Sequence, residues 1–126
     1  SLDTMSALLA ISIIALSTLS TETFECREGE MDWECANRES IIVEQKLNVI
    51  YRDLLAQMEA SDDKDQNNSR AELIKSQTLW VKFREVDCGA YEMFTSQSTS
   101  RSALAISCST EHAKTRIQQL FYFEHW

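Results

Sequence analysis

Apolar side chains recur at steps of three, four or seven residues along much of the chain, which is the spacing of one face of an α-helix. From Trp33 to about Glu59 this pattern predicts a helix of about seven turns. Its apolar stripe consists of Ala36, Val43, Leu47, Ile50, Leu54 and Met58. One face of this helix is therefore expected to lie against a core.

The next segment, ASDDKDQNNS at residues 60–69, has no apolar side chain after Ala60. This composition predicts a solvated loop. Ser69, with Glu72 three residues later, has the spacing of a capping box and predicts the start of a second helix that runs to about Phe94. The stripe predicted to face the core on this helix consists of Leu79, Phe83, Val86, Ala90 and Phe94.

A third helical stretch is predicted from Ser102 to about Phe123, after the hydroxyl-rich segment TSQSTSRS at residues 95–102. Its less regular apolar face consists of Leu104, Cys108, Ile117, Leu120 and Phe121. The chain has no proline and only two glycines, which favours long uninterrupted helices. Two helical hairpins predict an all-α antiparallel bundle of three long helices plus an apolar N-terminal helix, held by disulfides.

Residues 7–16, ALLAISIIAL, form an apolar run that as a helix would be about 15 Å long, too short to cross a hydrocarbon layer of about 30 Å. Two interpretations stay open: a secretion signal, or an apolar helix that packs on the body or on a second copy as a homodimer. We therefore divide the chain into an apolar N-terminal segment, 1–25, and one helical domain, 26–126.

Four cysteines stand at positions 26, 35, 88 and 108. No pair has the short spacing of a structural zinc site, and His112 and His125 are too far apart in sequence for a local ligand pair. An even number of cysteines favours disulfides and an oxidising compartment, the periplasm or the outside of the cell. Three pairings are open, and four free thiols are the alternative.

Geometry favours one pairing. On a continuous helix Cys88 and Cys108 would lie about 30 Å apart, whereas a disulfide requires about 6 Å between α-carbons. A hairpin at residues 95–102 would bring the two cysteines level on antiparallel helices. We therefore favour Cys88 with Cys108, which leaves Cys26 with Cys35.

The formal net charge is −8. Nucleic acids and anionic lipid surfaces would be repelled by such a protein, so neither is an expected partner. A cationic protein partner fits the charge, although a merely well-solvated acidic surface is the commoner explanation.

The segment LWVKFREVDC, residues 79–88, places a charged and aromatic flank beside the predicted stripe. In helical projection Trp80, Arg84, Asp87 and Tyr91 share this flank, where Arg84 is expected to stack on Trp80 and to pair with Asp87. Lys82 and Glu85 are expected to point outward. A structural seam between helices is a commoner use of such a flank than a ligand site.

No catalytic, metal or cofactor site is expected. Asp63, Asp65 and Asn67 have the spacing of the first EF-hand ligands, but Asn68 and Ile74 stand where glycine and a bidentate glutamate belong. No nucleophile lies in a recognisable turn, and there is no glycine-rich phosphate loop. The sequence therefore predicts a protein that is not an enzyme.

Several motifs occur in order along the chain: Cys26, Cys35 with Ala36, LNVIYRDL at 47–54, QTLWVKFREVDC at 77–88, and Cys108 with Thr110, Glu111 and Arg116. Together they resemble the LprI-like family of lysozyme-inhibitor domains. In the second-helix motif Trp80, Phe83, Arg84 and Asp87 match, and Glu85 stands where the family usually has aspartate. The Gly-Gly-Ser segment expected between the last two cysteines is missing.

The resemblance implies an exported bacterial protein that binds and blocks a peptidoglycan-cleaving enzyme, either a lysozyme or a rival's toxin to which it confers immunity. A basic hydrolase would be steered by the negative charge. Asp62, Asp63 and Asp65 are the candidate partner-binding residues, because binding groups concentrate on loops held by rigid elements. The alternative is a non-catalytic structural or oligomerisation module of the cell envelope.

Overall fold

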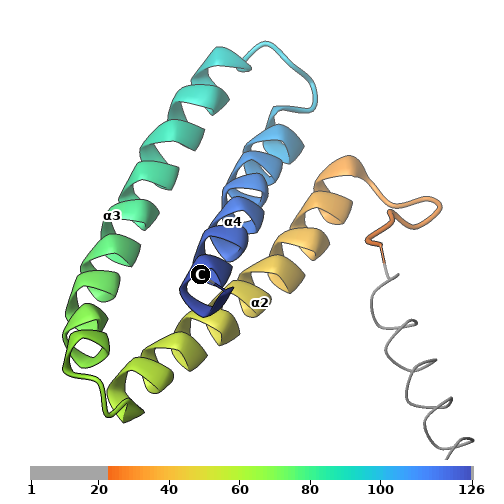
Figure 1. Cartoon of the computed structure of the whole chain (residues 1–126). Helices are drawn as coiled ribbons and strands as arrows, with labels where there is room; N and C mark the ends of the chain where they lie inside the picture. The colour runs from red at the N-terminus through yellow and green to blue at the C-terminus, as the bar shows by residue number, and fades with distance from the viewer. Residues whose placement is uncertain (1–22, 126) are drawn as a thin grey trace, which may run out of the picture.

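The computed structural model describes residues 23–125, which form three long helices. They are α2 (Asp32–Ala60), α3 (Lys64–Phe94) and α4 (Arg101–His125). Each helix runs antiparallel to the one before it, so α2 and α4 run in the same direction (Figure 1). The predicted all-α class is confirmed for this part of the chain, while the apolar run at 7–16 lies outside the described residues. None of the three helices is long and apolar enough to span a bilayer.

A short turn leads into α2. Gly29 has a φ of 81°, a left-handed conformation that glycine adopts without strain, and the N–H of Glu30 donates to the carbonyl of Arg27 (3.1 Å). At the helix start the Glu34 carboxylate accepts a hydrogen bond from the N–H of Met31 (3.0 Å). The predicted bounds of this first helix, Trp33 to about Glu59, agree with the structure within one residue at each end.

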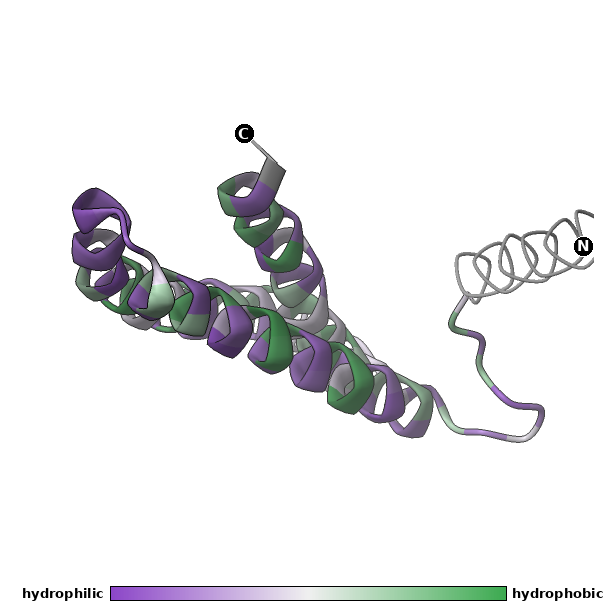
Figure 2. Ribbon diagram, turned by 60° about the horizontal axis from the view of Figure 1, so that its bottom comes forward, coloured by the Kyte–Doolittle hydropathy of each residue, from purple (hydrophilic) through white to green (hydrophobic). Residues whose placement is uncertain are grey.

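The predicted loop at 60–69 is too long, because α2 ends at Ala60 and α3 already begins at Lys64, so only residues 61–63 connect the two helices. Asp63, not Ser69, is the N-cap, and its Oδ1 accepts from the N–H of Gln66 (3.0 Å). Asn67 donates its side-chain amide to the carbonyls of Met58 (2.7 Å) and Ser61 (2.8 Å), so it satisfies the open end of α2. The polar residues are the solvated first turns of a helix, and Figure 2 shows hydrophilic residues at this junction.

The apolar core lies toward the α2–α3 junction. Its buried members are Leu47, Leu54, Met58, Leu73, Ala113, Ile117 and Leu120. Val43, Ile50 and Phe121 pack against this cluster, so the predicted stripe of α2 and part of that of α4 are confirmed. From α3 the core receives one buried side chain, Leu73, with Trp80 packed against it.

The predicted core stripe of α3 is wrong. Leu79, Phe83 and Val86 are 63%, 58% and 60% exposed, and Phe94 is 89% exposed. Cys88 instead turns inward, with 7% exposure. Cys88 follows Leu79 by nine residues, which is about half a turn away around a helix of 3.6 residues per turn. When Cys88 faces α4, the Leu79 stripe therefore faces away from the core.

Both favoured disulfides are present. Cys26 bonds Cys35 and Cys88 bonds Cys108, with Cα–Cα distances of 5.4 and 5.7 Å. Cys26 precedes α2, whereas Cys35 lies in its first turn. The two bridges lie toward the end of the bundle opposite the apolar core. Apolar burial thus holds one end of the bundle, while at the other end Cys88–Cys108 joins α3 to α4 and Cys26–Cys35 ties the preceding segment to α2.

Truncation of core and stripe leucines tests this arrangement. Leu47→Ala, at a side chain that is 1% exposed, is expected to lower the free energy of unfolding by about 3 kcal/mol. Leu79→Ala, the matched change on the exposed stripe, is expected to cost less than about 0.5 kcal/mol. Urea unfolding followed by circular dichroism measures both values, and equal losses would contradict the exposed position of Leu79.

Removal of the Cys88–Cys108 bridge tests its contribution. The double variant Cys88→Ala, Cys108→Ala is expected to be less stable by about 3 kcal/mol, because a closure over 20 residues no longer restricts the unfolded chain. Urea unfolding under non-reducing conditions gives the difference. A double variant as stable as the wild-type protein would show that the bridge does not hold α3.

Candidate functional site

The polar flank of α3 forms a seam with the other two helices. The Arg84 guanidinium lies over the Trp80 ring, 4.5 Å from its centroid, as predicted. Its ion-pair partner is Glu44 of α2 and not the predicted Asp87. Arg84 faces into the bundle, where it reaches a carboxylate on another helix. Lys82 and Glu85 are exposed, as predicted, and form a salt bridge with each other (3.9 Å).

Arg116 of α4 extends this seam from the opposite side. Its side chain is 8% exposed, and burial lowers the pKa of its guanidinium below the usual value. The guanidinium donates to Gln77 (2.9 Å) and Ser76 (3.0 Å) of α3 and to Gln119 (3.3 Å). These neutral acceptors satisfy a charge that would otherwise be costly to bury. Polar contacts therefore hold this part of α3 to α4.

Asp87 pairs with His112 of α4. The Oδ2 of Asp87 lies 2.6 Å from the Nε2 of His112. The ring of Phe83 meets the imidazole edge to face, with centroids 5.5 Å apart. This triplet joins the exposed stripe of α3 to the face of α4 that carries Cys108. His112 is a residue that sequence reasoning missed as a contact, although its position four residues after Cys108 places both on one helix face.

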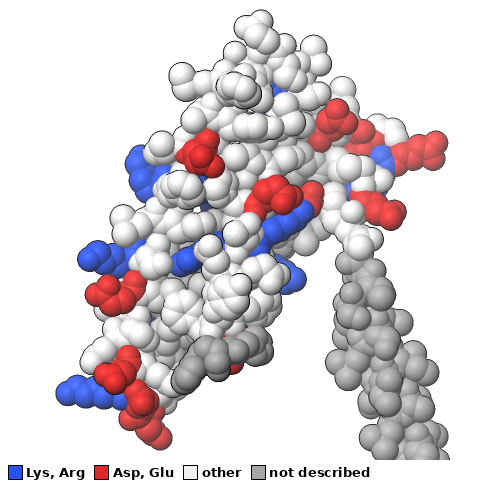
Figure 3. All heavy atoms as spheres, turned by 45° about the horizontal axis from the view of Figure 1, so that its top comes forward, with Lys and Arg blue, Asp and Glu red and all other residues white. Residues whose placement is uncertain are grey.

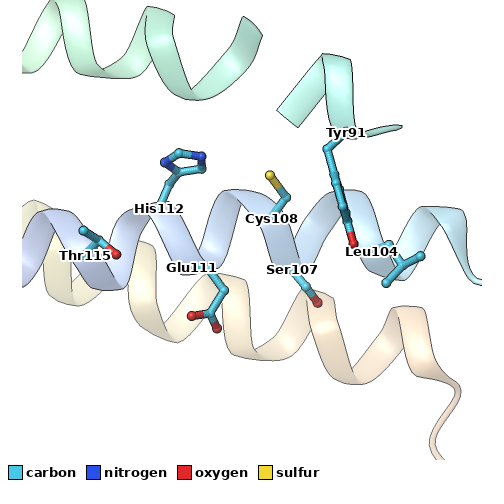
Figure 4. A pocket seen from close by; sticks show the side chains of 7 residues that line it. All are labelled: Tyr91, Leu104, Ser107, Cys108, Glu111, His112 and Thr115. Atoms are coloured by element: carbon cyan, nitrogen blue, oxygen red, sulfur yellow. The ribbon is translucent and has the colours of Figure 1, made fainter. Parts of the chain in front are cut away.

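A shallow groove of about 370 Å³ lies between α3 and α4 beside this triplet. Its lining residues are Tyr91, Leu104, Ser107, Cys108, Glu111, His112 and Thr115. Figure 4 shows Tyr91 reaching from α3 toward Leu104, with His112 and Cys108 on the side of α4 that faces α3. The groove is open and mainly apolar, which suits contact with a protein surface better than enclosure of a small molecule.

Within residues 23–125, two clusters have side chains of the metal-ligating types. They are Cys88, Cys108 and His112, and Cys26, Glu30 and Cys35. In each cluster both sulfurs form a disulfide. Because thiolates are the cysteine form that binds metals and attacks substrates, neither cluster can act as a thiolate site in this state.

The Arg38 side chain of α2 holds the segment that precedes this helix. Arg38 donates to Glu30 Oε2 (3.0 Å) and to the carbonyl of Glu25 (2.7 Å), and it lies 4.4 Å from the centre of the Phe24 ring. The hydrogen bonds from Arg38, followed by that from the backbone of Arg27, lower the pKa of Glu30 from 4.5 to about 2. Arg38 therefore fixes the Glu30 carboxylate and the backbone at Glu25 just before α2.

The three acids proposed from sequence as partner-binding residues lie at the α2–α3 junction. Asp62 is in the short connection, Asp63 caps α3, and Asp65 lies in its first turn. Asp65 also lines a cleft of about 710 Å³ with Phe123 and Glu124. Asp62 and Asp63 lie in the connection between the helices, whereas Asp65 is helical. The binding role of all three stays a prediction.

A profile of the lysozyme inhibitor LprI family matches residues 26–120. The chain belongs to this family. Searches among curated proteins and solved structures give no match. The LprI match begins at the first disulfide and ends in the core at Leu120, so it covers nearly all of the described fold. Most LprI-like motif residues of α3 lie in the seam: Gln77, Trp80, Arg84, Asp87 and Cys88 each contact another helix.

Because folding lowers the pKa of Glu30, the free energy of unfolding depends on pH. The pKa is lower in the folded state, so the Arg38 contact stabilises the fold above about pH 4.5, and this stabilisation is lost as pH falls toward 2. Titration by nuclear magnetic resonance is expected to give a pKa of about 2 for Glu30. In Arg38→Gln the pKa should rise toward 4.5, and an unchanged pKa would contradict the assigned cause.

Proposed function

We propose that this protein binds a peptidoglycan-cleaving enzyme outside the cytoplasm and blocks its activity. Membership of the lysozyme inhibitor LprI family is the observation that carries the proposal. Two disulfides support an oxidising compartment such as the periplasm or the exterior of the cell. The enzyme is a lysozyme or, in the immunity variant, a cell-wall-degrading toxin delivered by a rival.

The structure has properties that an inhibitor needs. Covalent bridges and a packed core limit the freedom that would be lost on binding, and preorganisation of this kind raises affinity. The net charge of −8 speeds encounter with a basic enzyme. No group on the inhibitor needs to perform chemistry, because occupation of the enzyme's cleft is sufficient. The proposed role is therefore non-catalytic.

A second candidate is a structural or oligomerisation module of the cell envelope. The exposed stripe of α3 favours it, because Leu79, Phe83 and Val86 are more than half exposed on one helix face. Such a face could pair with the same face of a second copy. Mutual repulsion between two chains of net charge −8 opposes this pairing.

An inhibition assay separates the two candidates. The purified protein is mixed at physiological salt with a panel of basic lysozymes and other cell-wall hydrolases, and the clearing of peptidoglycan suspensions is followed. We expect loss of clearing for at least one enzyme, with co-elution of the complex on a sizing column. Self-association without inhibition of any enzyme would support the envelope module and overturn the proposed function.

Salt provides a check on electrostatic steering. The association rate with the inhibited enzyme is expected to fall at least tenfold between about 0.05 and 0.5 M salt, because screening weakens long-range attraction. Stopped-flow mixing measures this rate. A rate independent of salt would show that the acidic surface does not steer the encounter.

A further inference from the structure

The α3–α4 connection and the residues just before it form an exposed tip on the bundle, which we call the hairpin tip (residues 93–100). Met93 and Phe94 are 78% and 89% exposed, although apolar side chains of this size are usually buried. The rest of the tip is Thr95, Ser96, Gln97, Ser98, Thr99 and Ser100, so no residue of the tip is charged. Figure 3 shows this end of the molecule largely without charged side chains.

The hairpin tip is held in shape. The N–H of Thr95 donates to Tyr91 (2.9 Å), that of Ser98 to Thr95 (2.9 Å), and that of Ser100 to the hydroxyl of Ser98 (3.2 Å). The Cys88–Cys108 bridge joins the two helices below it. Cys88 precedes Phe94 by six residues, about 9 Å along a helix. A braced tip of this kind enters a partner's cleft with little loss of conformational freedom.

Acidic residues lie beside the tip at the start of α2. Asp32 and Trp33 share a small cleft with Thr99 and Ser100, so the two segments are neighbours. The exposed acids of this segment are Glu25, Glu28, Asp32 and Glu34. An uncharged projection thus stands next to a concentrated negative surface, which is also visible in Figure 3.

We propose that the hairpin tip enters the saccharide-binding cleft of the inhibited enzyme, while the acids at the start of α2 contact the basic rim of that cleft. This inference rests on the proposed function and names the surface that performs it. The hydroxyl and amide groups of the tip offer hydrogen bonds of the kind that sugar hydroxyls make, and Phe94 supplies an apolar anchor.

The chemistry of glycan cleavage favours this tip over the acids at the α2–α3 junction. A glycoside-cleaving site contains two carboxyl groups on either side of the scissile bond. A carboxylate of the inhibitor at about 4 Å from one of them would be repelled by about 1 to 4 kcal/mol, depending on the local dielectric. An uncharged tip avoids this repulsion, whereas Asp62, Asp63 and Asp65 would meet it.

Matched substitutions test the proposal on the enzyme that the wild-type protein inhibits. Phe94→Ser and Gln97→Glu are expected to raise the inhibition constant at least about tenfold, the first by loss of the anchor and the second by repulsion in the cleft. Leu79→Ser, on the exposed stripe of the same helix, is the control and is expected to change it less than about twofold. Asp62→Asn tests the rival prediction that the acids at the α2–α3 junction bind the partner, and the present proposal expects a change of less than about twofold here as well. Circular dichroism and thermal unfolding are used to check that all four variants are folded.

Competition with sugar supplies an independent readout. The trimer of N-acetylglucosamine occupies the saccharide-binding cleft of a lysozyme. As the fraction of clefts filled by the trimer rises, the fraction of lysozyme bound by the wild-type protein is expected to fall in proportion. The proposal is overturned if the trimer has no effect, if Phe94→Ser and Gln97→Glu inhibit like the wild type, or if Leu79→Ser or Asp62→Asn weakens inhibition as much. It is equally overturned if light scattering shows a dimer that Phe94→Ser dissociates, because the tip would then bind a second copy. Absence of inhibition by the wild-type protein would instead refute the proposed function.

Discussion

The Cys88–Cys108 disulfide is the constraint on which the position of α3, and with it the hairpin tip, depends. Of the 31 residues of α3 only Leu73 and Cys88 are buried, and Leu73 lies toward the opposite end of the helix. Apolar burial therefore contributes little to the attachment of its C-terminal half. The ion pairs that join this half to the other helices, Arg84 with Glu44 and Asp87 with His112, are only partly buried. Pairs that solvent still reaches typically stabilise by about 1 kcal/mol or less, so they do not replace a covalent bond. The bridge also fixes the rotation of α3, since it turns the Leu79 face outward.

The seam around Trp80 complements this covalent link. Arg84 and Arg116 approach the Trp80 ring at 4.5 and 5.9 Å, and each then reaches polar partners on another helix. Directional contacts of this kind select one register between helices, whereas apolar packing tolerates small shifts. The residues that carry the LprI resemblance on α3 are thus mainly those that set the arrangement of the helices. A motif used in this way identifies the scaffold and leaves the binding surface free to differ.

Charge is distributed unevenly over the scaffold. The segment before and at the start of α2 holds five acids between Glu25 and Glu34, with Glu30 fixed by Arg38. The adjacent hairpin tip is neutral, so long-range attraction and close contact are assigned to different residues. Acidic side chains attract a basic partner from a distance, but their desolvation opposes burial at the centre of an interface. This separation fits a protein that must approach a basic surface and then occupy an uncharged or acidic cleft.

The sequence by itself determined the helical class, the bounds and buried face of α2, the disulfide pairing and the stacking of Arg84 on Trp80. These features depend on local spacing, or on a distance that one hairpin must satisfy. It did not determine the start of α3, because a polar first turn capped by Asp63 has the composition of a loop. Nor did it determine which face of α3 is buried. Helical periodicity identifies an apolar face but does not show whether another helix covers it. The available signal was that Cys88 lies half a turn around the helix from Leu79, so that a bridge from Cys88 to α4 turns the Leu79 face outward. Only the tertiary structure decided that the bridge and the polar seam prevail over the apolar stripe, because these contacts join residues that lie 20 to 40 positions apart along the chain.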